Sequence, residues 1–187
     1  SYEGLEARII NISGGEIDIT SSDDGLNATD KRASASADME QSAGDDGEGR
    51  RKDFQGGRGE FGGGLGDTQA DANINISGGV VRISAEGDGV DSNGYLTVSG
   101  GELYVTGPSN GGNGALDYGI DAVISGGVVV AAGQSGMAQN FGPESTQGTI
   151  LVNTQQQNAA GSEIMLFDST GRRLVAWTME KDYNSVV

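Results

Sequence analysis

The sequence predicts an all-β chain built as a parallel β-helix, a solenoid of stacked repeats, with an antiparallel β cap at the C-terminus. Two observations predict this fold. The decapeptide NISGGEIDIT at 11–20 returns as NISGGVVRIS at 75–84, TVSGGELYVT at 97–106 and VISGGVVVAA at 123–132. A second motif, a glycine followed by an apolar residue and an acid or amide, precedes each copy. Units this small bury a continuous core only when they are stacked.

The second motif reads EGLEA, DGLNA, DGVDS and YGIDA, with its glycines at Gly4, Gly25, Gly89 and Gly119. The first two copies set a repeat of about 21 residues. Alternation of apolar and polar residues predicts that the residue after each glycine points inward. These four residues are Leu5, Leu26, Val90 and Ile120. A series of β-hairpins in a meander or sandwich is the alternative, but hairpins do not require so regular a spacing.

Each Ser-Gly-Gly is expected at a corner between two strands, which gives two or three short strands per repeat. The serines are Ser13, Ser77, Ser99 and Ser125. The backbone must turn sharply there, with φ above zero at a glycine. Serines stacked at the corner can hydrogen-bond along the solenoid.

The repeats divide the chain into two parts. Residues 1–135 are expected to form the coils, interrupted by a Gly-rich, low-complexity insert at about 31–70. Residues 136–187 are expected to form a linking segment and the β-strand cap, with DSTG as a tight turn and Trp177 as the main anchor.

Composition excludes several classes of function. The formal charge of −16 disfavours nucleic acids and anionic membranes as partners and favours cations. The sequence has no Cys and no His, which excludes disulfides, zinc fingers and Ser-His-Asp triads. No apolar run predicts membrane insertion. Because the chain starts inside a repeat, we expect it to be part of a longer protein.

Acidic residues recur in register with the repeats. Alignment on the first glycine places Glu6, Asn27, Asp91 and Asp121 in one outward column, and Glu3, Asp24 and Asp88 in another. Asp23 and Asp117 lie one step earlier. Equivalent residues of neighbouring parallel strands lie about 4.8 Å apart, so oxygens from two repeats can reach one Ca²⁺. The alternative is a solvated face of turn-forming acids. Neither EF-hand spacing nor a nine-residue toxin repeat is present.

The DGLNA and NISGG units resemble a bacterial extracellular carbohydrate-binding domain family of clostridial type. The resemblance extends through GQSGMAQNFGPESTQGTILVN and GSEIMLFDSTGRRLVAWTMEKDYNSVV, and covers nearly all of the chain except the insert. It implies a right-handed parallel β-helix similar to pectate lyases, bound calcium, and affinity for cellulose or polygalacturonate. The implied calcium ligands are Glu6, Asp23, Asp24, Asn27, Asp88, Asp91, Asp117 and Asp121.

Three functions remain open on the sequence. The first is a non-enzymatic, calcium-dependent module that binds polysaccharide and is extracellular, secreted or on a bacterial surface. Arg82 and Tyr104 would contact the sugar as neighbours on one face, and ordinary packing between repeats is the alternative for Tyr104. The second is a polysaccharide lyase with Arg8 as the candidate base, and a salt bridge with a nearby acid is the simpler role for Arg8. The third is a structural or adhesive domain that calcium stiffens, without a dedicated glycan.

Overall fold

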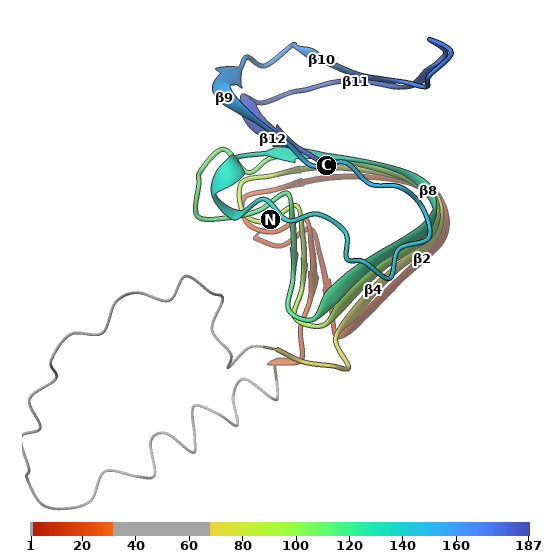
Figure 1. Cartoon of the computed structure of the whole chain (residues 1–187). Coiled ribbons are helices and arrows are strands. Elements are labelled where there is room, and N and C mark those ends of the chain that lie inside the picture. Colours follow the sequence, from red (N-terminus) through yellow and green to blue (C-terminus); the bar gives the residue numbers. More distant parts are fainter. Residues whose placement is uncertain (1, 32–67) are drawn as a thin grey trace, which may run out of the picture.

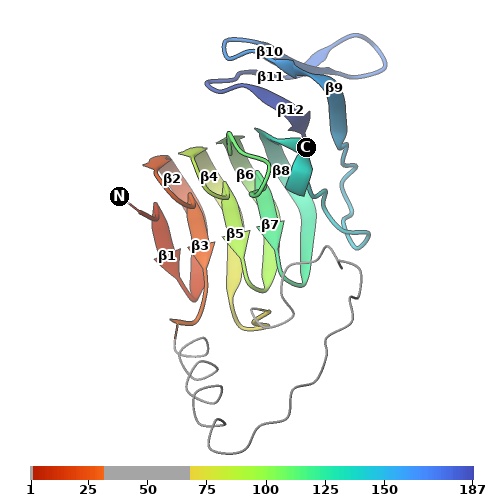
Figure 2. The same cartoon turned by 90° about the vertical axis from the view of Figure 1, so that its left-hand side faces the viewer.

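The computed structural model describes residues 2–31 and 68–187, which are mostly β-strand. The short strands form a parallel sheet in the order β1 (Leu5–Ala7), β3 (Leu26–Ala28), β5 (Val90–Ser92), β7 (Leu116–Tyr118). The long strands pair in parallel in the order β2 (Ile9–Ser21), β4 (Asn73–Ala85), β6 (Tyr95–Thr106), β8 (Asp121–Gly133). Figure 2 shows both sets of strands stacked side by side.

The prediction of a closed parallel β-helix is wrong. The described residues form parallel and mixed sheets, and these sheets do not close into a solenoid. Each repeat contributes one short and one long strand, and turns and loops rather than a third strand connect the long strand to the next short one. The six-stranded sheet is also mixed, because antiparallel strands follow β8.

The Ser-Gly-Gly motif lies inside each long strand, where the chain bends (Figure 1) and the pairing register shifts. The second glycine has φ between 83° and 91° in all four copies, as the sequence predicts. The first glycine allows close approach of the strands: a Cβ on Gly78 would lie 2.6 Å from the Ser13 carbonyl oxygen. The motif is therefore a built-in bend rather than a turn between separate strands.

The core lies between the short and long strands. Leu26 and Val90 are fully buried, as alternation predicts. Leu5 pairs in register with Leu26 but is 41% exposed, because β1 is the end strand of the sheet. The prediction fails for Ile120, which is 38% exposed, because Leu116 takes the equivalent position beside Val90. Leu103 and Val105 are fully buried on the long strands. One hydrophobic cluster therefore runs through all the repeats.

The C-terminal strands pair antiparallel. After a short 3-10 turn (Ser135–Met137) and an irregular segment come β9 (Val152–Asn158), β10 (Glu163–Phe167), β11 (Arg173–Thr178) and β12 (Tyr183–Val186). β12 pairs with both β8 and β9 and so extends the long-strand sheet. β10 and β11 form a separate hairpin. Figure 1 shows this hairpin above the long strands.

The C-terminal strands have a small hydrophobic cluster of their own. Its buried members are Ala132, Met179 and Tyr183, and Trp177 packs against them only partly buried. Met179 and Tyr183 are therefore buried more deeply than the predicted anchor. Most of the predicted insert lies outside the described residues. Among the residues that are described, no helix is long and apolar enough to cross a membrane.

Candidate metal centre

The repeat register brings three aspartates together at the two inner strands of the short-strand sheet, β3 and β5. Asp24 and Asp88 occupy equivalent positions, two residues before β3 and β5, and the Gly25 N–H donates to the Asp88 carbonyl oxygen. Asp91 lies within β5 and pairs with Asn27 of β3. The two columns that the sequence predicts, one through Asp24 and Asp88 and one through Asn27 and Asp91, therefore exist in the fold.

One carboxylate oxygen from each of Asp24, Asp88 and Asp91 lies within 4.8 Å of the other two. Calcium binds oxygens at about 2.3–2.6 Å, so two ligands of one ion can lie up to roughly 5 Å apart. The three carboxylates are therefore spaced as ligands of a single cation. Backbone contacts hold two of them: the Asp88 N–H donates to Asp24 Oδ1 at 2.8 Å, and the Gly114 N–H donates to Asp88 Oδ1.

Burial and mutual repulsion raise the pKa values of these carboxyl groups. Burial is the largest cause at Asp88, followed by repulsion from neighbouring aspartates, and its pKa rises to about 7 although the Gly114 N–H opposes the shift. Burial and repulsion from Asp24 and Asp88 raise the pKa of Asp91 to about 8. The pKa of Asp24 is raised as well, chiefly by burial. A divalent cation would relieve this repulsion between carboxylates.

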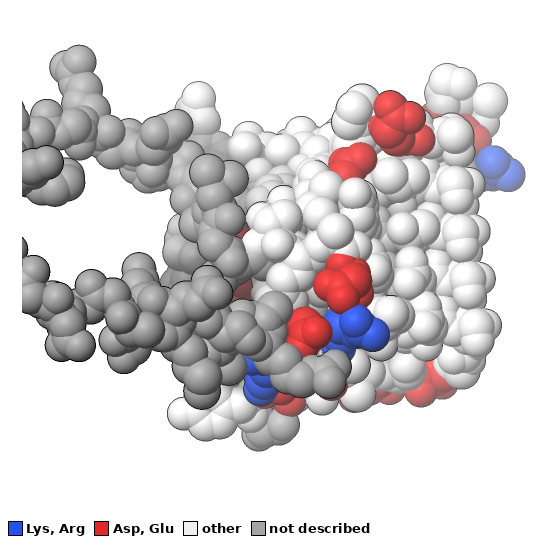
Figure 3. Space-filling model, turned by 90° about the horizontal axis from the view of Figure 1, so that it is seen from below, with Lys and Arg blue, Asp and Glu red and all other residues white. Residues whose placement is uncertain are grey.

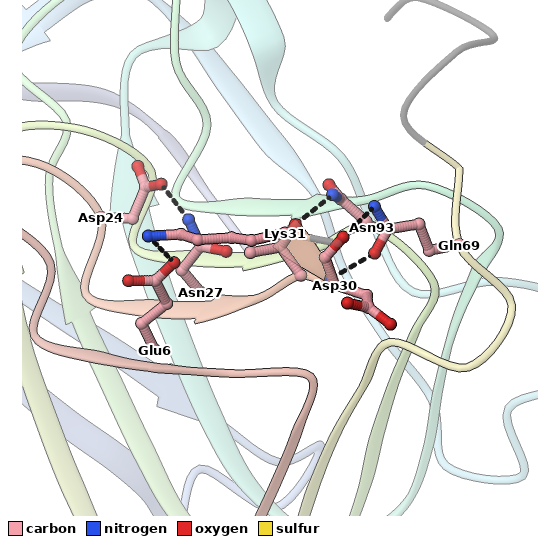
Figure 4. Close-up of polar contacts among 8 residues, drawn as sticks. Glu6, Asp24, Asn27, Asp30, Lys31, Gln69 and Asn93 are labelled. Atoms are coloured by element: carbon pink, nitrogen blue, oxygen red, sulfur yellow. Dashed lines mark hydrogen bonds and ion pairs between the residues drawn. The ribbon is translucent and has the colours of Figure 1, made fainter. Parts of the chain in front are cut away.

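Asn27 lies beside the aspartates and donates a hydrogen bond to one of them. Its Nδ2 donates to Asp24 Oδ2 at 3.1 Å (Figure 4), while only 9% of the residue is exposed. Its Oδ1 is buried and accepts no hydrogen bond from the part of the chain that the structure describes. An unsatisfied buried acceptor is costly. The amide nitrogen of Asn27, rather than its oxygen, faces Asp24, so the ligands that the structure brings together are the three carboxylates, which are oxygen ligands of the kind calcium prefers.

Glu6 occupies the first position of the Asn27–Asp91 column but is held by a lysine. Lys31 Nζ lies 2.5 Å from Glu6 Oε1, and Figure 4 shows the lysine reaching across to it. The hydrogen bond to Glu6, followed by its charge, raises the pKa of Lys31. Glu6 is therefore neutralised by an ion pair rather than grouped with the three aspartates.

Asp23 and Asp117 lie close enough to the three aspartates to affect them electrostatically. Both raise the pKa of Asp88 by repulsion. Asp117 pairs with Asp91 in the sheet, and its Oδ1 accepts a hydrogen bond from Gln139 Nε2 at 2.9 Å. Asp117 is therefore the fourth member of the Asn27–Asp91 column, a position that the sequence alignment gave to Asp121.

The predicted register of Asp121 is wrong. Asp121 is the first residue of β8, in the long-strand sheet, and pairs with Tyr95. Its Oδ1 accepts a hydrogen bond from the Ala122 N–H. The alignment failed because Ala115 stands in the fourth repeat where the others have glycine, and the YGIDA motif a few residues later imitates the missing pattern. The hydrogen bond from the Val90 N–H to the Ala115 carbonyl oxygen fixes the true register.

The residues proposed to contact substrate all have partners within the protein. Arg82 and Tyr104 are neighbours in register, as expected. Arg82 Nη1 lies 2.6 Å from Glu16 Oε1, and the Tyr104 ring stacks on Trp177 with centroids 4.3 Å apart. Arg8 lies 2.7 Å from Asp71. Basic side chains visible in Figure 3 likewise lie beside acidic ones.

Comparison with protein-family models, with curated proteins and with solved structures gave no match. The functional argument therefore rests on the residues and their geometry.

Proposed function

We propose that this chain is a calcium-dependent carbohydrate-binding module for cell-wall polysaccharide, related to the bacterial extracellular family that its repeats resemble. The observation that carries the proposal is the group Asp24, Asp88 and Asp91, with a carboxylate oxygen from each within 4.8 Å of the others. An extracellular location is part of the proposal. Extracellular modules work at high calcium concentrations, so a calcium site of low affinity is sufficient there.

Charge favours a pectate-like polyuronate as the first ligand. A chain of formal charge −16 repels a polyanion unless a cation lies between them. The three aspartates provide one carboxylate oxygen each to the group, whereas calcium takes six to eight oxygens. The remaining positions are then available to water or to oxygens of the polysaccharide. Neutral cellulose would gain less from such a bridge.

The test is retention on immobilised polygalacturonate, with and without calcium. We expect retention in calcium, loss in EDTA, and at least tenfold weaker binding for Asp88→Asn. Asp121→Asn is the matched control, because it removes the same charge from outside the group, and it should bind like wild type. Equal retention of both variants would contradict the proposal, as would retention that EDTA does not affect. Cellulose serves as the uncharged comparison.

A structural role for calcium, without a glycan ligand, is the second candidate. The observation that favours it is that Arg82 is paired with Glu16 and the Tyr104 ring is stacked on Trp177. Neither side chain is therefore presented freely to a sugar. Calcium that raises the Tm of a protein that no polysaccharide column retains would establish this role in place of the first.

We expect the protein to have no lyase activity. The candidate base, Arg8, is ion-paired with Asp71, and a paired guanidinium is a poor base. Incubation with polygalacturonate and calcium should give no unsaturated product by ultraviolet absorbance. Steady product formation that Arg8→Ala abolishes would instead establish an enzyme.

A further inference from the structure

The C-terminal hairpin and the last repeat enclose an apolar groove that the proposed function does not use. Its volume is about 730 Å³. One wall comes from β8, the other from β10 and β11, and the segment before β9 closes one side. The apolar residues that line the groove include Val128, Val130, Ile150, Leu166, Leu174 and Val175.

The β10–β11 hairpin packs against the rest of the protein near its C-terminal end, where β11 leads into β12, but its apolar side chains further along are exposed to solvent. Met179 and Tyr183, next to this end, are 1% and 6% exposed. Leu166 and Leu174 on the hairpin are 42% and 49% exposed, and Ile150 in the segment before β9 is 59% exposed. A two-stranded hairpin is only marginally stable by itself, so burial of these side chains by an occupant would stabilise it.

The chemistry of the lining defines the occupant. Charged residues make up 20% of the chain, yet none of those that the structure describes lines the groove. The polar residues of its lining are neutral: Gln147, Thr149, Thr154, Asn158 and Tyr183. A charged ligand would lose hydration there without gaining a partner. The groove therefore suits a molecule with an aliphatic body and, at most, an uncharged polar group.

The size of the groove and the net charge of the chain favour a small molecule, rather than a second copy of the chain, as the occupant of the groove. The volume of about 730 Å³ lies within the range of small-molecule pockets, roughly 300–1,000 Å³. A second copy would bring another formal charge of −16 against walls on which the described part of the chain places no basic residue. We propose that this groove binds an uncharged, mainly aliphatic small molecule.

The test uses Nile red, a neutral apolar dye, with the full chain. We expect saturable fluorescence enhancement at one dye per protein, unchanged by calcium or EDTA because the groove is separate from the aspartates. Octyl glucoside below its micelle concentration should displace the dye. Methyl glucoside has the same sugar without the chain and should not displace it.

Substitutions of residues that line the groove test whether the dye binds there. Leu166→Asp on the hairpin and Ile150→Asp in the segment before β9 should each weaken dye binding at least fivefold. Phe167→Asp is the matched control, because Phe167 is 50% exposed and adjacent to Leu166 but does not line the groove. Melting curves verify that each variant folds. Equal loss in all three variants would overturn the proposal, and so would dye binding that appears only with dimers in sedimentation.

Discussion

The stacked repeats and the β10–β11 hairpin bury their apolar side chains to very different extents. In the repeats, Leu26 and Leu103 are fully buried, whereas Leu166 and Leu174 of the hairpin are 42% and 49% exposed. The inner strands of the repeats pair on both sides, while the hairpin is a sheet of two strands. The repeats should therefore provide most of the folding free energy, and the hairpin should provide surface for binding.

Truncation of a leucine in each region should show the largest difference. Leu103→Ala removes a fully buried side chain and should lower the free energy of unfolding by about 3 kcal/mol. Leu174→Ala should cost less than about 1 kcal/mol, because its side chain is half exposed. Denaturant melts measure both values. Similar losses would mean that the hairpin is part of the same cooperative core.

Glycines with φ above zero provide the next comparison. Gly79 has φ +87°, and a Cβ there would lie 2.8 Å from backbone atoms of Gly14 and Gly15. Gly171 in the hairpin turn has φ +84°, and a Cβ there would meet no atom within 4 Å in the part of the chain that the structure describes. Strain alone costs about 1–2 kcal/mol, so Gly171→Ala should lose about 1 kcal/mol and Gly79→Ala clearly more. Chemical denaturation of both variants measures the two losses, and equal losses would show that strand contact at the bend is unimportant.

The buried aspartates Asp24, Asp88 and Asp91 should make the stability of the repeats depend on pH. The pKa of Asp91 is raised from 3.8 to about 8, so the folded state holds this proton more tightly than the unfolded state. Its contribution to stability is complete below about pH 4 and is lost as the pH rises through about 8. Without metal, stability should fall by on the order of 3 kcal/mol between about pH 5.5 and pH 8.5.

Asp91→Asn removes this titration and should flatten the fall, whereas Asp121→Asn should keep the wild-type slope. Thermal melts in EDTA at several pH values measure it. A wild-type slope in Asp91→Asn would show that Asp91 is not a source of the pH dependence.

Exposed ion pairs should have the smallest effect, and an equal one in both regions. Lys31 pairs with Glu6 in the repeats, and Arg172 pairs with Asp168 in the hairpin turn. Lys31→Ala and Arg172→Ala should each leave the Tm almost unchanged, because exposed ion pairs contribute little. A clear fall in Tm for only one of them, measured by thermal melts, would mean that ion pairing, and not burial alone, distinguishes the two regions.

Repetition determined which features could be predicted from the sequence. The columns through Asp24 and Asp88 and through Asn27 and Asp91 follow from a glycine at a fixed step. The alignment placed the fourth repeat in the wrong register because Ala115 replaces that glycine. The same alternation predicts strands but not closure, which depends on loops of unequal length. Neither the burial of Asn27 nor the stacking of Trp177 on Tyr104 has a local signal, because both depend on segments far apart in the chain.

Direct titration with calcium tests the central claim that Asp24, Asp88 and Asp91 bind one cation. Isothermal titration calorimetry near pH 7 should show calcium binding with release of protons, because Asp88 and Asp91 have pKa values of about 7 and about 8. Asp91→Asn should lose that site and Asp121→Asn should retain it. Absence of calcium binding by the wild-type chain, or equal binding by both variants, would contradict the assignment.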